Sequence, residues 1–447
     1  MTMGPESQPG KVVEASIFDT VRVMKTVVAP TIAKGVIKRR ASVEALAQHH
    51  GLDTKALRLL QDLRRKYGNG PLLLRFPFRS QVLLLDPSHV AQVLSETPVP
   101  FASASKEKRS ALAHFEPGNI LISDASRRAE LRPVHEDALA ANDRVHPFAE
   151  HFKNVVNEEL QCLLDNPDGG VKIDLDWDKF SQAWFRIIRR ISLGDAARDD
   201  ERLTGDLDNI RRRANWGFAA FTNKRKLESF QAQLERYLQN REEGSLVSRL
   251  PNSSGLDLES QVAQWLFAFD AAGMATFRAL ALLGCQPDQQ SKAIEEANAA
   301  SADHPFSRAI IIDALRLWPT SPAILRELTK DHQVGGQTFK KGTAVIIFAP
   351  FFHRDNERLA FADQMSPSTW INNESDLSAG LVPFSAGPAM CPAHNLVPMV
   401  ASLVMAALLS KATITLVQPL LDPKALPGTL DNFEIKLRLS KQTAGAE

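Results

Sequence analysis

The sequence of 447 residues lacks the features that mark several protein classes. Its three cysteines, Cys162, Cys285 and Cys391, lie far apart and form no Cys-x-x-Cys pair, which excludes a disulfide framework and a zinc site of that type. Lys and Arg number 53 against 52 Asp and Glu, so the net charge of +1 predicts no general attraction to nucleic acid or anionic lipid. The sparse cysteines predict a reducing, cytoplasmic location.

Long apolar runs and cofactor fingerprints are also scarce. The first sixteen residues are polar and contain no signal-like apolar core. The most apolar segment, 265–283, carries Asp270 and Arg278, so we expect no transmembrane anchor. The sequence has no glycine-rich dinucleotide fingerprint, flavin motif or iron–sulfur cysteine cluster. We therefore do not expect this chain to collect electrons from NAD(P)H by itself.

A basic amphipathic segment lies near the N-terminus, at residues 16–40. Ile17, Val21, Met24 and Val28 recur there at helical spacing among Lys and Arg residues. A basic amphipathic helix can lie on a membrane surface, but packing of the apolar stripe against the protein body is the commoner arrangement. We predict that this stripe packs on the body and that Pro30 breaks the helix.

The remaining pattern is mostly helical. Apolar residues three and four apart predict helices over 134–165, 176–194, 199–216, 224–240, 257–284 and 286–300. Strands are expected at 72–76, 81–85, 344–348 and 433–439, with a hairpin at 332–348. No long linker divides the chain. We predict a mainly α fold with a small β-rich subdomain (α+β) and a single domain over 1–447, in which 1–45 is a polar and amphipathic extension.

The segment 381–396, LVPFSAGPAMCPAHNL, places Phe384, Gly387 and Cys391 in a Phe-x-x-Gly-x-x-x-Cys frame ahead of a helical run. A glycine permits a tight bend that directs backbone N–H groups at the sulfur. The positive end of the following helix favours a thiolate. This combination suits a metal-ligating cysteine, and taken alone it suits a buried, inert cysteine equally well.

Two other segments suggest chemistry. Asp313 and Arg316 are three residues apart on one helix face and can form an ion pair. Within the long helix predicted over 257–284, the small Ala272-Gly273 step lets a flat group approach the backbone. Thr276, one turn later, can position water beside a disrupted helical hydrogen bond. A solvated ion pair and a helix with one small residue would explain the same sequences.

Together and in this order, these segments resemble the cytochrome P450 family of haem-thiolate enzymes. The resemblance rests on 272–276, 313–316, the segment HRDNERLAFADQMSPSTW at 353–370 and the loop FSAGPAMC at 384–391. It implies a P450-type fold with a long central helix over the haem, haem b as cofactor, and a monooxygenase that activates O2.

The resemblance also implies roles for individual residues. Cys391 would be the axial thiolate, with Phe384 packed beside it and Gly387 forming the bend. Thr276 would hold water near the bound oxygen, where Ala272 and Gly273 would leave room. Three arginines would pair with the haem propionates: Arg128, Arg132 and Arg326. Arg128 and Arg132 could instead be solvated charges on a helix.

The sequence departs from the family pattern at several positions. Ala275 stands where an acid normally precedes the threonine, and Asp313 is one methylene shorter than the usual glutamate. Thr369 replaces an arginine that normally joins the Asp313 pair, and Ala389 replaces a basic residue. Pro392 has no N–H to donate to the sulfur, so we expect a lower haem potential.

Partners and substrate follow from the resemblance only in outline. Electrons would come from a ferredoxin or flavodoxin with its NAD(P)H reductase, docking on a basic patch at Arg127, Arg128 and Arg132. A small lipophilic substrate would meet an apolar wall formed by Phe101, Phe115, Ile120, Leu121, Phe267, Ala271, Ile324 and Leu430.

Three functions compete at this point. The first is a monooxygenase that hydroxylates or dealkylates a lipophilic molecule. The missing acid at Ala275 suggests, as an alternative, a peroxygenase that uses hydrogen peroxide without a partner. The departures at Asp313, Thr369 and Ala389 suggest a haem-binding protein with little or no turnover.

Overall fold

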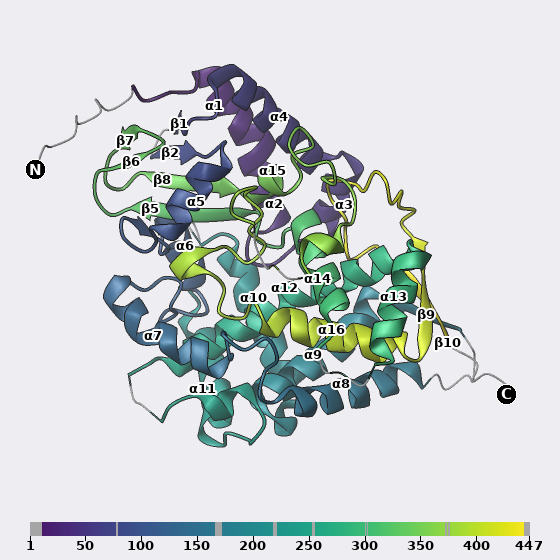
Figure 1. Cartoon of the computed structure of the whole chain (residues 1–447). Coiled ribbons are helices and arrows are strands. Elements are labelled where there is room, and N and C mark those ends of the chain that lie inside the picture. The colour runs from purple at the N-terminus through teal and green to yellow at the C-terminus, as the bar shows by residue number, and fades with distance from the viewer. Residues whose placement is uncertain are drawn as a thin grey trace, which may run out of the picture.

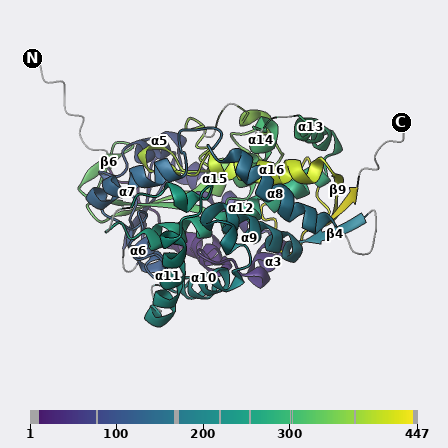
Figure 2. The same ribbon diagram turned by 90° about the horizontal axis from the view of Figure 1, so that it is seen from below.

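The computed structural model describes residues 11–76, 79–165, 172–217, 221–252, 255–299, 301, 303–371, 373 and 376–441. A large helical body carries a five-stranded sheet at one end and a three-stranded sheet at the other, as Figures 1 and 2 show. This arrangement confirms the predicted mainly α fold with a small β-rich part.

The larger sheet joins strands from both halves of the chain. Its order is β1 (Leu72–Arg75), β2 (Ser80–Leu83), β8 (Ala344–Phe348), β5 (Ala323–Leu328) and β3 (Phe101–Ala102). β2 and β8 are parallel and the other neighbouring pairs are antiparallel. The β2–β8 pairing therefore brings the N-terminal strands beside strands that come after α14 in the chain.

The predicted hairpin is only partly correct. β6 (His332–Val334) and β7 (Gln337–Phe339) form a two-stranded hairpin around Gly335 and Gly336, which both have positive φ. The next strand, β8, leaves this hairpin for the main sheet. The second sheet consists of β4 (Lys172–Asp176), β10 (Lys436–Lys441) and β9 (Ala412–Gln418), of which only β10 was expected.

The helix α12 (Leu258–Gly284) runs through the middle of the body. It packs against α9 (Trp177–Leu193), α11 (Lys224–Gln239), α14 (Pro305–Leu317) and α16 (Leu396–Leu409). By length and composition it is the one helix in the described residues that could cross a membrane, but 83% of its apolar window is buried inside the protein. Its apolar residues point to all sides because protein surrounds it.

The predicted helix over 134–165 is in fact two helices. Ala140, with a φ of 46°, interrupts the run between them. The remaining helices have the following bounds: α3 (Ala41–His49), α4 (Leu52–Tyr67), α5 (Pro87–Ser95), α6 (Lys106–Leu112), α7 (Ala125–Ala138), α8 (Ala149–Leu164), α10 (Glu201–Ala214), α13 (Pro287–Ala297) and α15 (Ala349–His353).

The N-terminal segment packs on the body through a different face from the one predicted. Val23 and Val27 are buried, whereas Ile17 is 86% exposed and Met24 is 36% exposed. The apolar stripe chosen from the sequence is therefore on the solvent side. The inward-facing residues Asp19, Thr20, Val23 and Val27 are less apolar than the exposed stripe, so apolar spacing alone did not indicate which face packs.

Pro30 does not break this helix either. α1 (Ile17–Val23) continues through a π-helical turn at Met24–Val28 into α2 (Ala29–Lys34), where Pro30 occupies the first turn and needs no N–H partner. Lys34 then forms an ion pair of 2.7 Å with Asp53. Residues 11–45 are thus part of the packed body rather than an extension, and residues 1–10 lie outside the described residues.

Candidate active site

Cys391 lies in the segment between α15 and α16, five residues before α16 begins at Leu396. Its backbone N–H donates to the carbonyl of Phe384 over 2.9 Å, which closes the loop around the sulfur. Burial raises the pKa of the Cys391 thiol, whereas the backbone N–H of Ala393 and the charge of Arg132 act in the opposite direction. The sulfur thus has a backbone donor two residues away, and Pro392 supplies none.

Gly387 makes the bend that the sequence predicted. Its φ is +66°, and a Cβ built on it would lie 2.3 Å from the backbone oxygen of Leu94 on α5. A side chain is therefore excluded both by the backbone conformation and by the neighbouring helix. This close contact places the cysteine loop directly against α5.

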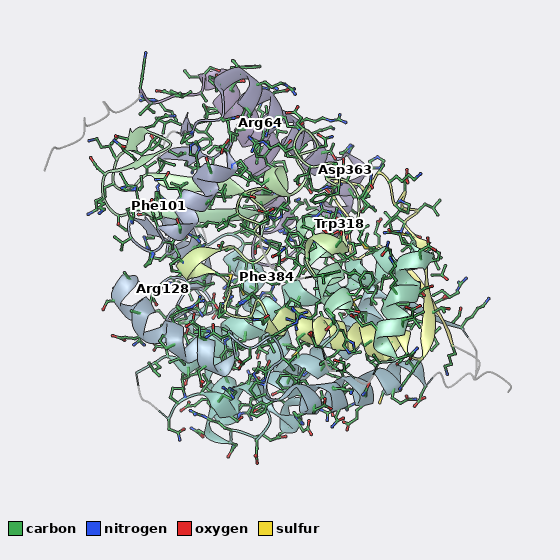
Figure 3. The ribbon with its side chains drawn as sticks, viewed as in Figure 1. Arg64, Phe101, Arg128, Trp318, Asp363 and Phe384 are labelled. Carbon is green, nitrogen blue, oxygen red and sulfur yellow. The ribbon has the colours of Figure 1, made fainter. Side chains whose placement is uncertain are left out.

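Two buried arginines lie beside this loop, and Figure 3 labels one of them, Arg128. Arg128 of α7 donates to the carbonyl of Pro388 over 3.4 Å, and its Nη1 is buried with no hydrogen-bond partner. Arg326 of β5 donates to the hydroxyls of Thr97 and Ser385 over 3.0 and 3.3 Å. Burial lowers the pKa of both arginines to about 10, and Arg326 also feels the charge of Arg128. Among the described residues, no carboxylate forms an ion pair with either one.

These groups fit a haem. Two buried guanidinium groups without carboxylate partners match the two propionates of that cofactor, and the half-buried cysteine of the neighbouring loop matches a thiolate ligand for its iron. Arg128 and Arg326 would hold the propionates, and Cys391 would hold the iron. The unpartnered Nη1 of Arg128 is the observation that favours an absent anion most directly.

Arg132 does not belong to this pair. Its guanidinium donates to Glu136 over 2.6 Å and to the carbonyl of Met390 over 2.7 Å. Its charge is thus already balanced, and its role is to hold the cysteine loop against α7. The predicted propionate contact of Arg132 stays a prediction, and in this structure Glu136, one helical turn away, holds its guanidinium.

The predicted basic docking patch is wrong. Arg127 forms ion pairs with Glu130 and Asp257 over 2.9 and 3.2 Å. Arg128 is buried, and Arg132 is paired with Glu136. The three arginines therefore present no unpaired basic surface to an acidic partner.

The segment of α12 that the sequence singled out is a regular helix. The hydroxyl of Thr276 is buried and donates to the carbonyl of Ala272 over 2.8 Å, within one turn. The helix continues without interruption from Leu258 to Gly284, so the expected break in its hydrogen bonding is absent from this part of the described chain. Thr276 and Ala272 are nevertheless brought together, as the resemblance implied.

Gly273 lies directly against a tryptophan of a neighbouring helix. A Cβ on it would lie 2.8 Å from Nε1 of Trp184, which donates to the carbonyl of Phe269 over 2.8 Å. Gly273 therefore makes room for a tryptophan of α9, and its predicted role beside dioxygen stays a prediction. Ala272 and Gly273 lie about 100° apart on the helix, so the two small residues face different neighbours.

Asp270, an acidic residue on the same helix, forms ion pairs with other parts of the protein. Asp270 forms a buried ion pair of 2.6 Å with Arg211 of α10 and lies 3.6 Å from Lys38. Burial raises the pKa of this carboxyl, but the two cations outweigh burial and lower it overall. Asp270 therefore stays charged and paired, and it does not replace the acid that is missing at Ala275.

Asp313 and Arg316 form the expected ion pair at 2.5 Å, and both side chains are fully buried. Arg316 also donates to three backbone carbonyls in the segment 353–364. Thr369 does not join the pair. Instead, Asp313 accepts hydrogen bonds from Nε1 of Trp370 over 2.8 Å and from the N–H of Ser366 over 2.7 Å.

The sequence analysis missed this substitution. Trp370 follows Thr369, the residue that stands where the family pattern has an arginine. Its indole N–H is a neutral donor to Asp313 in place of that arginine. Its position in the sequence was the available signal, since an indole N–H in a buried place needs an acceptor.

The predicted substrate wall is only partly assembled. Phe115 and Phe267 meet edge to face with ring centroids 5.5 Å apart. Phe101 instead packs on His332 in a separate apolar cluster under the main sheet. Leu430 lies in the helical core, where its carbonyl accepts from Arg278 over 2.9 Å. These two residues therefore stabilise other parts of the molecule.

A buried acid beside this wall escaped the sequence analysis. Glu116 is fully buried next to Phe115, and the side-chain amide of Gln264, oriented to donate, lies 2.8 Å from its Oε1. Burial raises the pKa of Glu116 well above its usual value, although Arg211 opposes the shift. Nothing in its local sequence distinguishes it from a surface glutamate.

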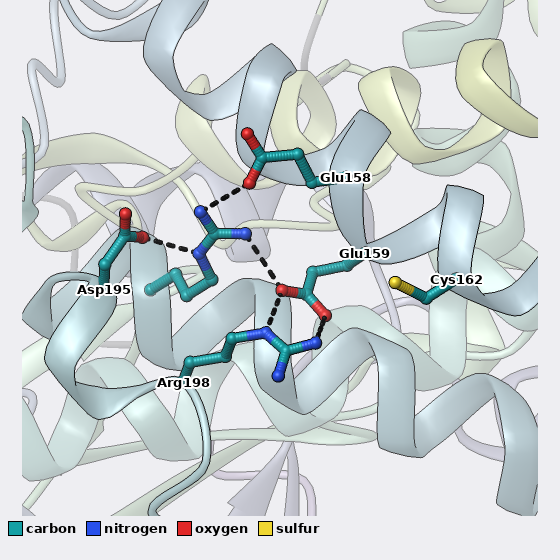
Figure 4. A pocket seen from close by; sticks show the side chains of 6 residues that line it. Glu158, Glu159, Cys162, Asp195 and Arg198 are labelled. Carbon is teal, nitrogen blue, oxygen red and sulfur yellow. Dashed lines mark hydrogen bonds and ion pairs between the residues drawn. The ribbon is translucent and has the colours of Figure 1, made fainter.

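A surface pocket on the outer side of α8 and α9 is a separate feature (Figure 4). Its centre is Glu159, which pairs with Arg190 over 2.9 Å and with Arg198 over 2.7 Å. Asp195 also pairs with Arg190 over 2.6 Å. These mutual ion pairs join α8, α9 and the turn that follows, so this pocket is explained by packing.

A family model described as Cytochrome P450 matches residues 252–427. This span contains Thr276, the Asp313–Arg316 pair and Cys391, in the arrangement described above. Over this part of the sequence the chain matches the cytochrome P450 family.

Individual relatives match stretches of 121 to 200 residues. A protein named "Probable cytochrome P450 4s3" from Drosophila melanogaster is 30% identical over 144 residues, covering 31% of this chain and 29% of the relative. "Cyclooctat-9-en-7-ol 5-monooxygenase" from Streptomyces melanosporofaciens is 26% identical over 200 residues, covering 40% and 43%. "Methyltetrahydroprotoberberine 14-monooxygenase" from Papaver somniferum is 31% identical over 121 residues, covering 26% and 23%. The matched regions thus span between about a quarter and two fifths of these curated relatives.

Proposed function

We propose that this chain is a P450-type oxidoreductase, a haem-thiolate monooxygenase that oxidises a small lipophilic organic molecule with O2. The observation that supports this most is the half-buried Cys391 on the loop beside Arg128 and Arg326, two buried cations without carboxylates of their own. Two relatives are named as monooxygenases, which supports the same reaction type. When bound, haem b would supply the activation of O2.

The residues of the chain would then bind, orient and exclude water. Arg128 and Arg326 hold the two carboxylates of the cofactor, and the N–H of Ala393 steadies the sulfur of Cys391. The hydroxyl of Thr276 holds a water, and Phe115 with Phe267 keeps bulk water from the apolar side. We place the electron source in a separate ferredoxin or flavodoxin with its NAD(P)H reductase.

A carbon monoxide difference spectrum of the reduced protein tests this proposal first. We expect a strongly red-shifted Soret band that is lost in Cys391→Ser, because only a thiolate ligand produces it. Consumption of NAD(P)H with a surrogate ferredoxin system and a lipophilic substrate should follow. A protein that binds no haem, or whose band does not depend on Cys391, would refute the proposed function.

A peroxygenase is the second candidate, and specific contacts favour it. Ala275 offers no acid, and Asp270 is held by Arg211 and Lys38, so no carboxyl of this stretch of α12 serves proton delivery. Substrate oxidation with hydrogen peroxide alone, at a rate matching the reconstituted system, would support this candidate. The cytoplasmic location and the organisation as one domain stay predictions.

A further inference from the structure

Lys108 lies on α6, a short helix tied to the strand that carries Arg326. The chain enters α6 from β3, which pairs with β5 so that Ala102 faces Glu327. The backbone N–H of Lys106 donates to Glu327 over 3.2 Å. The first turn of α6 is therefore fixed beside residue 327, the direct neighbour of Arg326.

The other charged residues of α6 turn toward the outside. Arg109 lies 3.8 Å from Glu327, and Glu107 pairs with Arg79 over 2.8 Å. Lys108 lies about 100° from Arg109 and about 200° from Lys106 around the helix, so it points away from Glu327. Successive residues of a strand point to opposite faces, so Arg326 also points away from Glu327. Lys108 and Arg326 thus share the inner side.

Lys108 has no ion pair or side-chain hydrogen bond among the described residues. The charges inside the protein that act on Lys108 most are those of Arg326 and Arg128, and both are cations. Burial and this repulsion lower the pKa of Lys108 to about 7. Three cations from α6, α7 and β5 therefore converge without an anion, an arrangement that is unfavourable until an anion enters.

We propose that Lys108 is the third cation of this cluster and forms an ion pair with a carboxylate bound there. The inference rests on the proposed function, because the loaded site supplies that carboxylate. Two sources share this chemistry: a haem propionate, for which Lys108 replaces the basic residue lost at Ala389, and the acidic head of a substrate. Arg128 and Arg326 already match the two propionates in charge, so Lys108 adds one positive charge that either source can use.

The experiment compares the haem-loaded wild type with Lys108→Met, Lys108→Arg and Lys106→Met. Lys106 is an exposed lysine on the same helix and serves as the matched control. The transfer of haem to excess apomyoglobin measures haem loss, and spectral titration measures the binding of dodecanoate and of the neutral dodecanol. Unfolding curves of each variant check that the fold is retained.

Two results would support the proposal and identify the carboxylate. Haem loss that is about tenfold faster in Lys108→Met, but not in Lys108→Arg or Lys106→Met, assigns a propionate. Unchanged haem loss with dodecanoate binding weakened about tenfold, and dodecanol binding unaltered, assigns a substrate carboxylate.

Two other results would overturn it. The first is that Lys108→Met loses haem and binds dodecanoate as the wild type does. The second is that Lys108→Met and Lys106→Met change haem loss and dodecanoate binding equally. Either result would show that Lys108 binds no carboxylate. A wild type that takes up no haem would contradict the proposed function as well, so the two failures are distinguishable.

Discussion

Gly387 is the residue of the cysteine loop whose replacement the backbone tolerates least. We expect Gly387→Ala to lower haem content and to destabilise the protein by more than the ~1–2 kcal/mol of a left-handed alanine, because its Cβ would also collide with the backbone of Leu94. Haem absorbance and urea unfolding measure the two effects. Gly336→Ala is the control, since Gly336 has a φ of +76° but no atom within 4 Å of a Cβ. Equal losses in both variants would contradict the collision.

Pro392 limits the hydrogen bonds to the thiolate. Ala393 directs its N–H at the sulfur, and the proline before it has none to give. Pro392→Ala restores one donor, which withdraws charge from the sulfur, so we expect a more positive haem potential. A spectroelectrochemical redox titration of both proteins measures it. An unchanged or more negative potential would contradict the prediction.

At the scale of elements, Trp370 joins α14 to the segment that leads toward the cysteine loop. Trp370→Phe keeps the ring but removes the donor to Asp313, so we expect a loss of about 1–3 kcal/mol, because a buried carboxylate oxygen loses a partner. Thr369→Val is the control, since that hydroxyl contacts Ser366 and not Asp313. Urea midpoints of the two variants decide the matter. A Thr369→Val loss as large as that of Trp370→Phe would contradict the role of the indole.

The sequence predicted those elements whose apolar pattern is long or whose turn chemistry is distinctive. The central helix and the cysteine loop belong to this group. β5 was missed because Arg326 and Glu327 interrupt its apolar alternation, although one is buried against the loop and the other is tied to α6. The role of Gly273 depended on Trp184, which lies about 90 positions away in the sequence. Contacts of this kind have no local signal.

At the scale of the whole molecule, the two ends of the chain interlock beside the C-terminal half of α12. Asp431 donates its backbone N–H to the side chain of Gln48 on α3 over 2.6 Å. Arg278 of α12 lies between the two segments, donating to the carbonyl of Leu430 and lying 3.5 Å from Glu44. The sequence could not predict this closure, because its partners are more than 380 residues apart and individually ordinary.

This junction contains a carboxyl that makes stability depend on pH. Asp431 is buried, its Oδ2 has no hydrogen-bond partner, and burial raises its pKa to about 6. The folded state therefore binds the proton more tightly than the unfolded state, whose Asp pKa is about 3.9. The contribution of this proton to the free energy of unfolding is fully present below about pH 4 and is lost as the pH rises through about 6. The loss is at most about 3 kcal/mol.

Asp431→Asn removes the charge and keeps an oxygen for the N–H of Phe433. We expect this variant to be more stable than wild type at pH 7, by about 1–3 kcal/mol, and the difference to vanish near pH 4. Urea unfolding at pH 4, 5, 6 and 7 measures both. Asp422→Asn, in an exposed turn where Asp422 accepts from the N–H of Lys424, controls for the general loss of one negative charge. If Asp431→Asn is less stable than the wild type at pH 7, the prediction is wrong. The Asp431 carboxylate would then stabilise the fold, because its attraction to Arg278 would outweigh the cost of its burial.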